Sequence, residues 1–238
     1  FLILGEYASP EQLRSLHREL GLDRPLVVQY FAYLYDVVRG DLGSSIRTGR
    51  SVFGEIIKVL PHTLLLALGG VFVSLLLGLP LGAIAAIHRG RGIDALASVA
   101  CLFGLSMPVF LLGLSLLLLF SYHLGWFPVL GAGEFGQSRS IAVHLVLPSL
   151  TVGLTVMGQI GRMTRSSILD SIDQDYTRTA RAKGLPERRI VYKHAFRNAL
   201  LPIVTVARLS LGYLVGGAVI TETIFARPGV GRLLIEAI

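Results

Sequence analysis

Long stretches without charged residues dominate the pattern of hydrophobic and polar positions along this chain. Asp, Glu, Lys and Arg are absent from three stretches of 29, 39 and 22 residues, at 59–87, 95–133 and 140–161. A fourth stretch, 198–221, carries only Arg208. A helix that crosses a membrane needs roughly 20 mostly apolar residues. The pattern therefore predicts four transmembrane helices, at about 59–87, 96–122, 141–162 and 199–221.

Composition supports a membrane protein. The 238 residues are 53% hydrophobic and 16% charged, whereas a soluble domain carries about 25% charged residues. A large soluble protein with buried helices is the alternative, but such helices are rarely this long and free of charge. The single cysteine, Cys101, cannot form a disulfide within the chain and is expected to serve packing.

Lys and Arg are unevenly distributed between the loops, and this predicts the topology. The segment 162–197 carries nine Lys and Arg against four acidic residues, and the loop 88–94 has two Arg and one Asp. The stretch 1–58 is balanced, and the loop 122–140 holds one acid and one Arg. Cytoplasmic loops are enriched in Lys and Arg, so the two basic loops should lie inside. A nucleic-acid surface is the alternative for 162–197, but the segment lacks a recognition motif.

The stretch before the first span predicts two amphipathic helices outside the membrane. Ser9 as N-cap and Pro10 at the first helical position begin the first helix, which Gly21 ends. The second runs over 26–39 and ends at Gly40. These helices either cap the bundle, or they form a landing surface for a substrate-delivering protein or part of an outer gate.

Within the spans, glycine and proline predict how the helices pack. Glycines recur in all four spans and allow membrane helices to approach closely. Pro61, Pro80, Pro108 and Pro148 are expected to kink helices or to stand near their ends.

The basic segment after the third span predicts a helix, a corner and a second helix. The third span is expected to continue as a polar helix through Asp175. Lys183, Gly184 and Pro186 form a helix stop, and Pro186 also begins the next helix, 186–197. A bent, rigid protrusion of this kind suits the transfer of force from a partner.

This segment resembles the coupling loop of ABC importer permeases, whose general motif is EAA-x₃-G-x₉-I-x-L-P. Arg178, Thr179 and Ala180 occupy the EAA positions, with Arg in place of Glu, and Gly184 is the motif glycine. Pro202 follows Gly184 by 18 residues, five more than in the general form. In this longer spacing the segment resembles the dipeptide/oligopeptide/nickel branch of the family. The stretches GEYASPEQL, LGLPLGAIAA, HAFRNALLP and TETIFARPGVGRLL extend the resemblance over nearly the whole chain.

The resemblance implies an all-α polytopic membrane protein with the bundle and cytoplasmic coupling helix of an ABC importer permease. Residues 1–238 would form one transmembrane domain, with four spans visible and one more helix missing at each end. Its expected parts are external helices at 1–58, three spans within 59–162, the coupling segment 163–198, the fourth span 199–222, and an external loop with the start of the last helix at 223–238. The expected residues of coupling to the ATPase are Arg178, Thr179, Ala180, Arg181, Lys183, Gly184, Leu185, Pro186 and Glu187.

The resemblance also implies the partners. These are a second homologous permease subunit, two ATP-binding subunits or domains, and an external substrate-binding protein, in a bacterial or archaeal cytoplasmic membrane. The chain has no phosphate-binding loop and no metal-ligand motif. We therefore expect no catalytic or metal-binding residue and no cofactor in this chain, with ATP and Mg²⁺ bound by the partners. The expected cargo is a short peptide; a nickel complex and glutathione are the alternatives.

Arg208 is the one charged residue in the interior of a predicted span, since Arg162 stands at the end of the third. It lies about 16 Å along its helix from Arg197, which places it in mid-membrane. A charge at this depth is costly unless it is hydrated or paired, so Arg208 is expected to face a water-filled path or a partner helix, and could meet a peptide carboxylate. His62 and His144 are expected to be interfacial histidines near the outer ends of spans.

Two other classes of function compete with the permease. An intramembrane hydrolase could use Ser106 and His144, but the sequence around Ser106 is not G-x-S-x-G. An ion-coupled transporter would be expected to carry acidic residues within its spans.

Overall fold

The structure is a computed structural model that describes the chain except for residues 1–22, 46–47, 134–136, 173, 187–189 and 191–195. The regular secondary structure of the described part is helical, apart from one isolated β-bridge between Ser44 and Ser51. The chain divides into two compact units. One comprises Phe1–Leu60 with Glu236–Ile238, and the other comprises Pro61–Ile235.

The smaller unit contains α2, Leu26–Val38. Pro25 stands directly before α2, and Gly40, with a φ of 82°, follows its end. These boundaries confirm the predicted helix over 26–39. None of the α2 residues is buried, and the guanidinium carbon of Arg39 lies 4.1 Å from the centroid of the Tyr35 ring. The other predicted external helix, over 9–21, lies outside the described residues.

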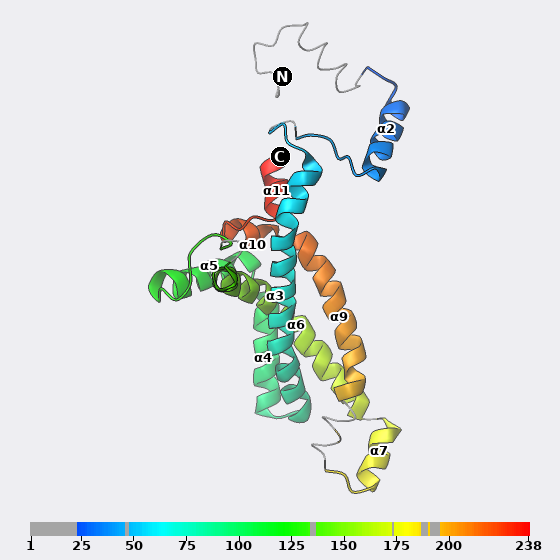
Figure 1. Ribbon diagram of the computed structural model, residues 1–238. Coiled ribbons are helices and arrows are strands. Elements are labelled where there is room, and N and C mark those ends of the chain that lie inside the picture. Colours follow the sequence, from blue (N-terminus) through cyan, green and yellow to red (C-terminus); the bar gives the residue numbers. More distant parts are fainter. Residues whose placement is uncertain (1–22, 46–47, 134–136, 173, 187–189, 191–195) are drawn as a thin grey trace. The chain divides into compact units, whose positions relative to one another are not determined.

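The remaining described helices follow along the chain as Figure 1 shows. They are α3 (Val52–Ile87), α4 (Gly92–Ser106), α5 (Val109–Leu116), the π-helical segment η1 (Leu117–His123), α6 (Ser138–Ile172), α7 (Asp175–Ala182), α9 (Phe196–Gly217), α10 (Val219–Ile224) and α11 (Val230–Ala237). Within the described residues, α3, α6 and α9 are long and apolar enough to cross a membrane. α4, taken together with α5 and η1, is also long and apolar enough, but it is bent at the break between the two parts. The four predicted spans thus correspond to three continuous helices and one broken one.

The second predicted span, 96–122, is not a single straight helix. α4 ends at Ser106, α5 starts after Pro108, and the two halves are bent by 102°. Proline disfavours helical backbone in the residue before it, and Met107 accordingly has extended backbone with φ −74° and ψ 125°. Pro108 stands directly before α5, which agrees with the expectation that proline kinks a helix or stands near its end; Pro61, Pro80 and Pro148 lie inside α3 and α6.

α6 is the central helix of the larger unit. In α6, 50% of the most apolar 18-residue segment is buried, compared with 28% of the corresponding segments of α3 and α9. Apolar side chains of these three helices form the buried core. A Cβ atom added to Gly78 of α3 would lie 2.9 Å from Ile160 Cγ2, and one added to Gly158 would overlap the Cys101 carbonyl oxygen of α4. These close approaches confirm that glycines set the helix spacing.

Candidate functional site

The predicted corner at Gly184 follows the end of α7. α7 ends at Ala182, the Lys183 amide donates to the Thr179 carbonyl oxygen at 3.1 Å, and Gly184 has a φ of 76°. This left-handed backbone favours glycine, because a Cβ atom crowds the following carbonyl oxygen. The predicted helix stop is therefore confirmed.

The corner is open to its surroundings. Lys183, Gly184 and Pro186 are exposed, and Leu185 is half-buried. A Cβ atom added to Gly184 would meet no atom of the described residues within 4 Å. Beyond the corner the Ile190 amide donates to the Pro186 carbonyl oxygen at 3.2 Å, as expected for a new helical turn. The corner thus presents backbone that a partner protein could approach closely.

Some predicted coupling residues are only partly described. Arg178, Ala180 and Arg181 belong to the helical backbone of α7, but their side chains lie outside the description. Glu187 and most of the predicted helix 186–197 also lie outside the described residues.

The polar extension of the third span is interrupted, which corrects the expectation of one helix through Asp175. α6 ends at Ile172, and α7 begins at Asp175. The fully buried Thr177 hydroxyl has one hydrogen to donate, and the carbonyl oxygens of Ile172, at 2.6 Å, and Gln174, at 2.5 Å, both lie within hydrogen-bond distance of it. Carbonyl groups at a helix end lack partners within the helix, so Thr177 provides a donor for them and fixes the junction between α6 and α7.

An ion pair joins α6 to the first turn of α4. The Arg165 guanidinium donates to both carboxylate oxygens of Asp94, from Nε to Oδ1 at 2.7 Å and from Nη2 to Oδ2 at 2.8 Å. The Gly90 amide also donates to Oδ2 at 2.9 Å. A bidentate pair of this kind fixes orientation as well as distance. It brings together the two basic loops that the charge pattern assigned to one side of the membrane.

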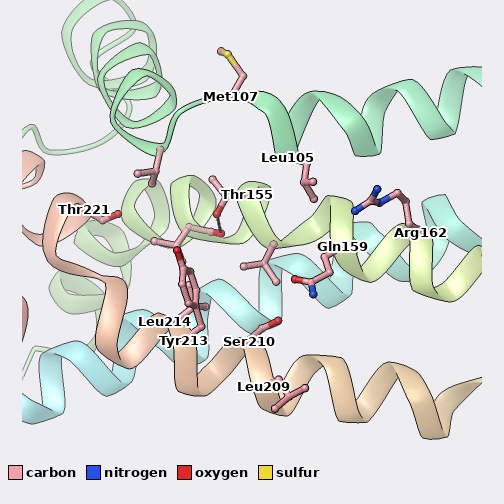
Figure 2. A pocket seen from close by; sticks show the side chains of 13 residues that line it. Leu105, Met107, Thr155, Gln159, Arg162, Leu209, Ser210, Tyr213, Leu214 and Thr221 are labelled. Carbon is pink, nitrogen blue, oxygen red and sulfur yellow. Dashed lines mark hydrogen bonds between the residues drawn. The ribbon is translucent and has the colours of Figure 1, made fainter.

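A cavity of about 690 Å³ lies between α6, α9 and the break between α4 and α5. Figure 2 shows Thr155, Gln159 and Arg162 along α6, with Ser210 and Tyr213 on α9 on the opposite side. The remaining lining residues are mostly apolar. The cavity therefore combines an apolar wall with a short series of polar groups, as ligand sites do.

Arg208, the residue predicted from the sequence for the translocation path, does not line this cavity, although its neighbours Leu209 and Ser210 do. The Arg208 side chain is exposed on α9. Sequence reasoning missed Gln159 and assigned Arg162 only to the cytoplasmic charge cluster. The available signal was the spacing of Thr155, Gln159 and Arg162, which is i, i+4 and i+7 on one helical face.

A second polar cluster, which sequence reasoning did not identify, surrounds the buried Glu222. The Thr63 hydroxyl donates to Glu222 Oε1 at 2.6 Å, and the Arg232 amide donates to Oε2 at 3.0 Å. The Val230 amide donates to Thr63 Oγ1 at 2.9 Å. A Cβ atom on Gly229 would overlap the Glu222 carboxylate. This network ties α3 to α10 and to the start of α11, on either side of the turn between them.

Arg227 lies within the same turn and is fully buried. Its guanidinium nitrogens have no hydrogen-bond partner among the described residues. Burial lowers the pKa of Arg227, and the charge of Glu222 opposes that effect. The preceding residue, Ala226, has a φ of 47°, which is uncommon for a residue with a side chain. The stretch TETIFARPGVG thus folds into a specific buried turn.

Two protein-family models match the chain. The model described as "Binding-protein-dependent transport system inner membrane component" covers residues 78–238. A second, for the N-terminal part of such membrane components, covers residues 1–67. Together they include α6, α7, the Gly184 corner and the Glu222 turn.

Curated relatives match almost the full chain. The dipeptide transport system permease protein DppB of Alkalihalophilus pseudofirmus is 38% identical over 99% of this chain and 77% of its own length. The di/tripeptide transport system permease protein DppB of Pseudomonas aeruginosa is 41% identical over 100% of this chain and 77% of its own. The glutathione transport system permease protein GsiC of Salmonella paratyphi A is 40% identical over 100% and 75%.

A solved structure shares the fold. It is an inward-facing conformation of the MetNI methionine ABC transporter, with a TM-score of 0.59 and 22% identity. The match covers 76% of this chain and 79% of that chain.

Proposed function

The chain belongs to the family of binding-protein-dependent transport system inner membrane components, and we propose that it is the permease subunit of an ABC importer of short peptides. Its relatives that carry dipeptide, di/tripeptide and glutathione permease names match 99–100% of its length. Glutathione is itself a tripeptide, so these names agree on a class of cargo.

The observation that carries the mechanism is the connection between the cavity and the corner through α6 and α7. α6 contributes Thr155, Gln159 and Arg162 to the cavity wall and continues to Ile172. The buried Thr177 hydroxyl then joins it to α7, which leads directly to Gly184. A displacement of the corner would therefore move one wall of the cavity.

ATP hydrolysis belongs to partner subunits in this proposal. Two ATP-binding subunits or domains hold ATP and Mg²⁺, and their closure pushes the exposed Gly184–Leu185 corner. The Asp94–Arg165 pair transmits part of that movement to α4, because it links the first turn of α4 to α6. The cavity then changes its access from the cytoplasmic to the external side, where a binding protein delivers the peptide.

The exposed position of Arg208 supports a second permease subunit. α9 displays Leu201, Val204, Leu209 and Tyr213 on its surface, together with Arg208. A charged side chain in the middle of a span is costly against lipid. We propose that Arg208 faces the homologous subunit or a water-filled path between the two subunits.

The coupling can be tested in the complete complex, co-expressed with its partner subunits and placed in lipid discs. ATP hydrolysis is measured with and without the binding protein and dipeptides, for the wild type and for Gly184→Asp. Peptide-stimulated hydrolysis that is lost in an assembled Gly184→Asp complex supports the proposal. If only nickel complexes stimulate ATP hydrolysis, the cargo is a nickel complex and not a short peptide. Absence of any associated ATPase would reject the proposal.

A further inference from the structure

We propose that Arg162 and Gln159 form a site for the C-terminal carboxylate of the passing peptide, which enters the cavity with that end toward the cytoplasm. The inference rests on the proposed function of peptide import and adds the peptide group that the permease recognises.

The geometry places these polar groups in one line. Thr155, Gln159 and Arg162 recur at i, i+4 and i+7, so they share a face of α6, and all three line the cavity. Figure 2 shows Ser210 and Tyr213 of α9 on the other side of the same space. Hydroxyl and amide groups can both donate and accept hydrogen bonds, as the amide groups of a peptide require.

The charge of the cavity selects an anion. Of the described residues that line the cavity, only Arg162 is charged, and none carries a carboxylate. Among the described residues, no carboxylate oxygen forms an ion pair with Arg162 within 4.0 Å. Arg165, three residues further along α6, is already paired with Asp94. A guanidinium binds a carboxylate through two parallel hydrogen bonds, so the Arg162 guanidinium is available to bind the peptide carboxylate in this way.

The dimensions fit a short peptide. Thr155 and Arg162 are seven residues apart, which corresponds to about 10 Å along the helix. An extended dipeptide spans about 7 Å and a tripeptide about 10 Å. The cavity volume of about 690 Å³ also lies within the range of roughly 300–1,000 Å³ that is usual for small-ligand sites.

The direction of the peptide follows from the position of Arg162 on α6. From Thr155 to Arg162 the helix runs toward Ile172 and α7, which is the end that carries the coupling segment. The carboxylate therefore lies on the cytoplasmic side of the peptide, and the ammonium group lies toward the break at Met107.

A single introduced thiol tests the site directly. Cys101 is the only cysteine of the chain and is buried, whereas Leu105 lines the cavity and is 43% exposed. Leu105→Cys in the complete complex, in lipid discs without binding protein, is labelled with an uncharged methanethiosulfonate. The rate is measured with dialanine and with dialanine amide. The parent chain controls for labelling of Cys101.

Dialanine should slow the labelling and its amide should not. Arg162→Gln should raise the dialanine concentration for half-maximal protection by about tenfold or more, because it removes a charge-assisted pair. Arg162→Lys should retain part of the protection, and Arg91→Gln, on the exposed loop before α4, should retain all of it.

Three results would overturn the inference. They are equal protection by the acid and the amide, unchanged protection in Arg162→Gln, and no labelling or no protection in a complex that still imports dialanine with ATP. A wild-type complex that neither imports the dipeptide nor shows stimulated ATP hydrolysis would instead overturn the proposed function.

Discussion

Replacement of Glu222 tests whether its buried hydrogen bonds stabilise the turn between α10 and α11. Each carboxylate oxygen accepts one hydrogen bond, from the Thr63 hydroxyl at 2.6 Å and from the Arg232 amide at 3.0 Å. A hydrogen bond to a charged group contributes about 1.5–3 kcal/mol. Glu222→Gln keeps one acceptor oxygen and should lower the free energy of unfolding by about 1.5–3 kcal/mol. Glu222→Ala loses both bonds and should lower it by about 3–6 kcal/mol.

The matched control is Glu55→Gln. Glu55 also contacts two partners, Arg50 at 3.6 Å and Lys58 at 3.7 Å, but both partner side chains are largely exposed, at 68% and 70%. Exposed ion pairs contribute about 0–1 kcal/mol. Unfolding of the purified proteins by SDS in mixed micelles, followed by far-ultraviolet circular dichroism, gives the three free energies. If Glu222→Gln and Glu222→Ala lose no more stability than Glu55→Gln, the buried network does not stabilise this turn.

Three further predictions concern the Gly184 corner, the Asp94–Arg165 pair and the exposed face of α9. Gly184 and Gly90 both have a φ of 76° and open space around the Cβ position, so replacement by Asn should strain both backbones equally. Gly184→Asn should lower peptide-stimulated ATP hydrolysis several-fold, whereas Gly90→Asn should leave it unchanged. Equal losses in the two variants would reject a partner contact at Gly184. Asp94→Asn combined with Arg165→Gln should lower the melting temperature of the complex no more than the more harmful single change, because the two side chains share one bidentate pair; additive losses would contradict this. Arg208→Leu should impair peptide uptake while the complex still assembles, as judged by size-exclusion chromatography, and normal uptake would refute a role in the path.

The apolar pattern and the turn residues predicted much of this fold. Three of the four expected spans are continuous helices, because a long charge-free stretch in a membrane has few alternatives to a helix. The helix stop at Gly184 was also predictable, since Lys183, Gly184 and Pro186 act within a few residues of one another. The bend in the second span was not predictable, because the apolar composition of that span carries no sign of a 102° change of direction. Pro108 indicated only where a helix could end or kink.

The candidate sites depend on contacts between distant parts of the chain. Thr63 and Glu222 are 159 residues apart in sequence, and Asp94 and Arg165 are 71 apart. Local periodicity cannot pair such residues, because it reports one helix at a time. The position of Arg208 within an apolar stretch made it the natural candidate for the path, whereas the cavity is lined by Arg162, whose place at the end of a span resembled that of any cytoplasmic basic residue.

The most direct test of peptide import is uptake of a radiolabelled dipeptide into proteoliposomes that contain the complete complex. Binding protein is added outside, and ATP or a non-hydrolysable analogue is enclosed on the side of the ATP-binding subunits. Accumulation against a gradient that requires both ATP and the binding protein is the predicted result. Accumulation that proceeds without ATP and follows an ion gradient would contradict assignment as an ABC importer permease, and ATP-driven uptake that excludes all short peptides would contradict the proposed cargo.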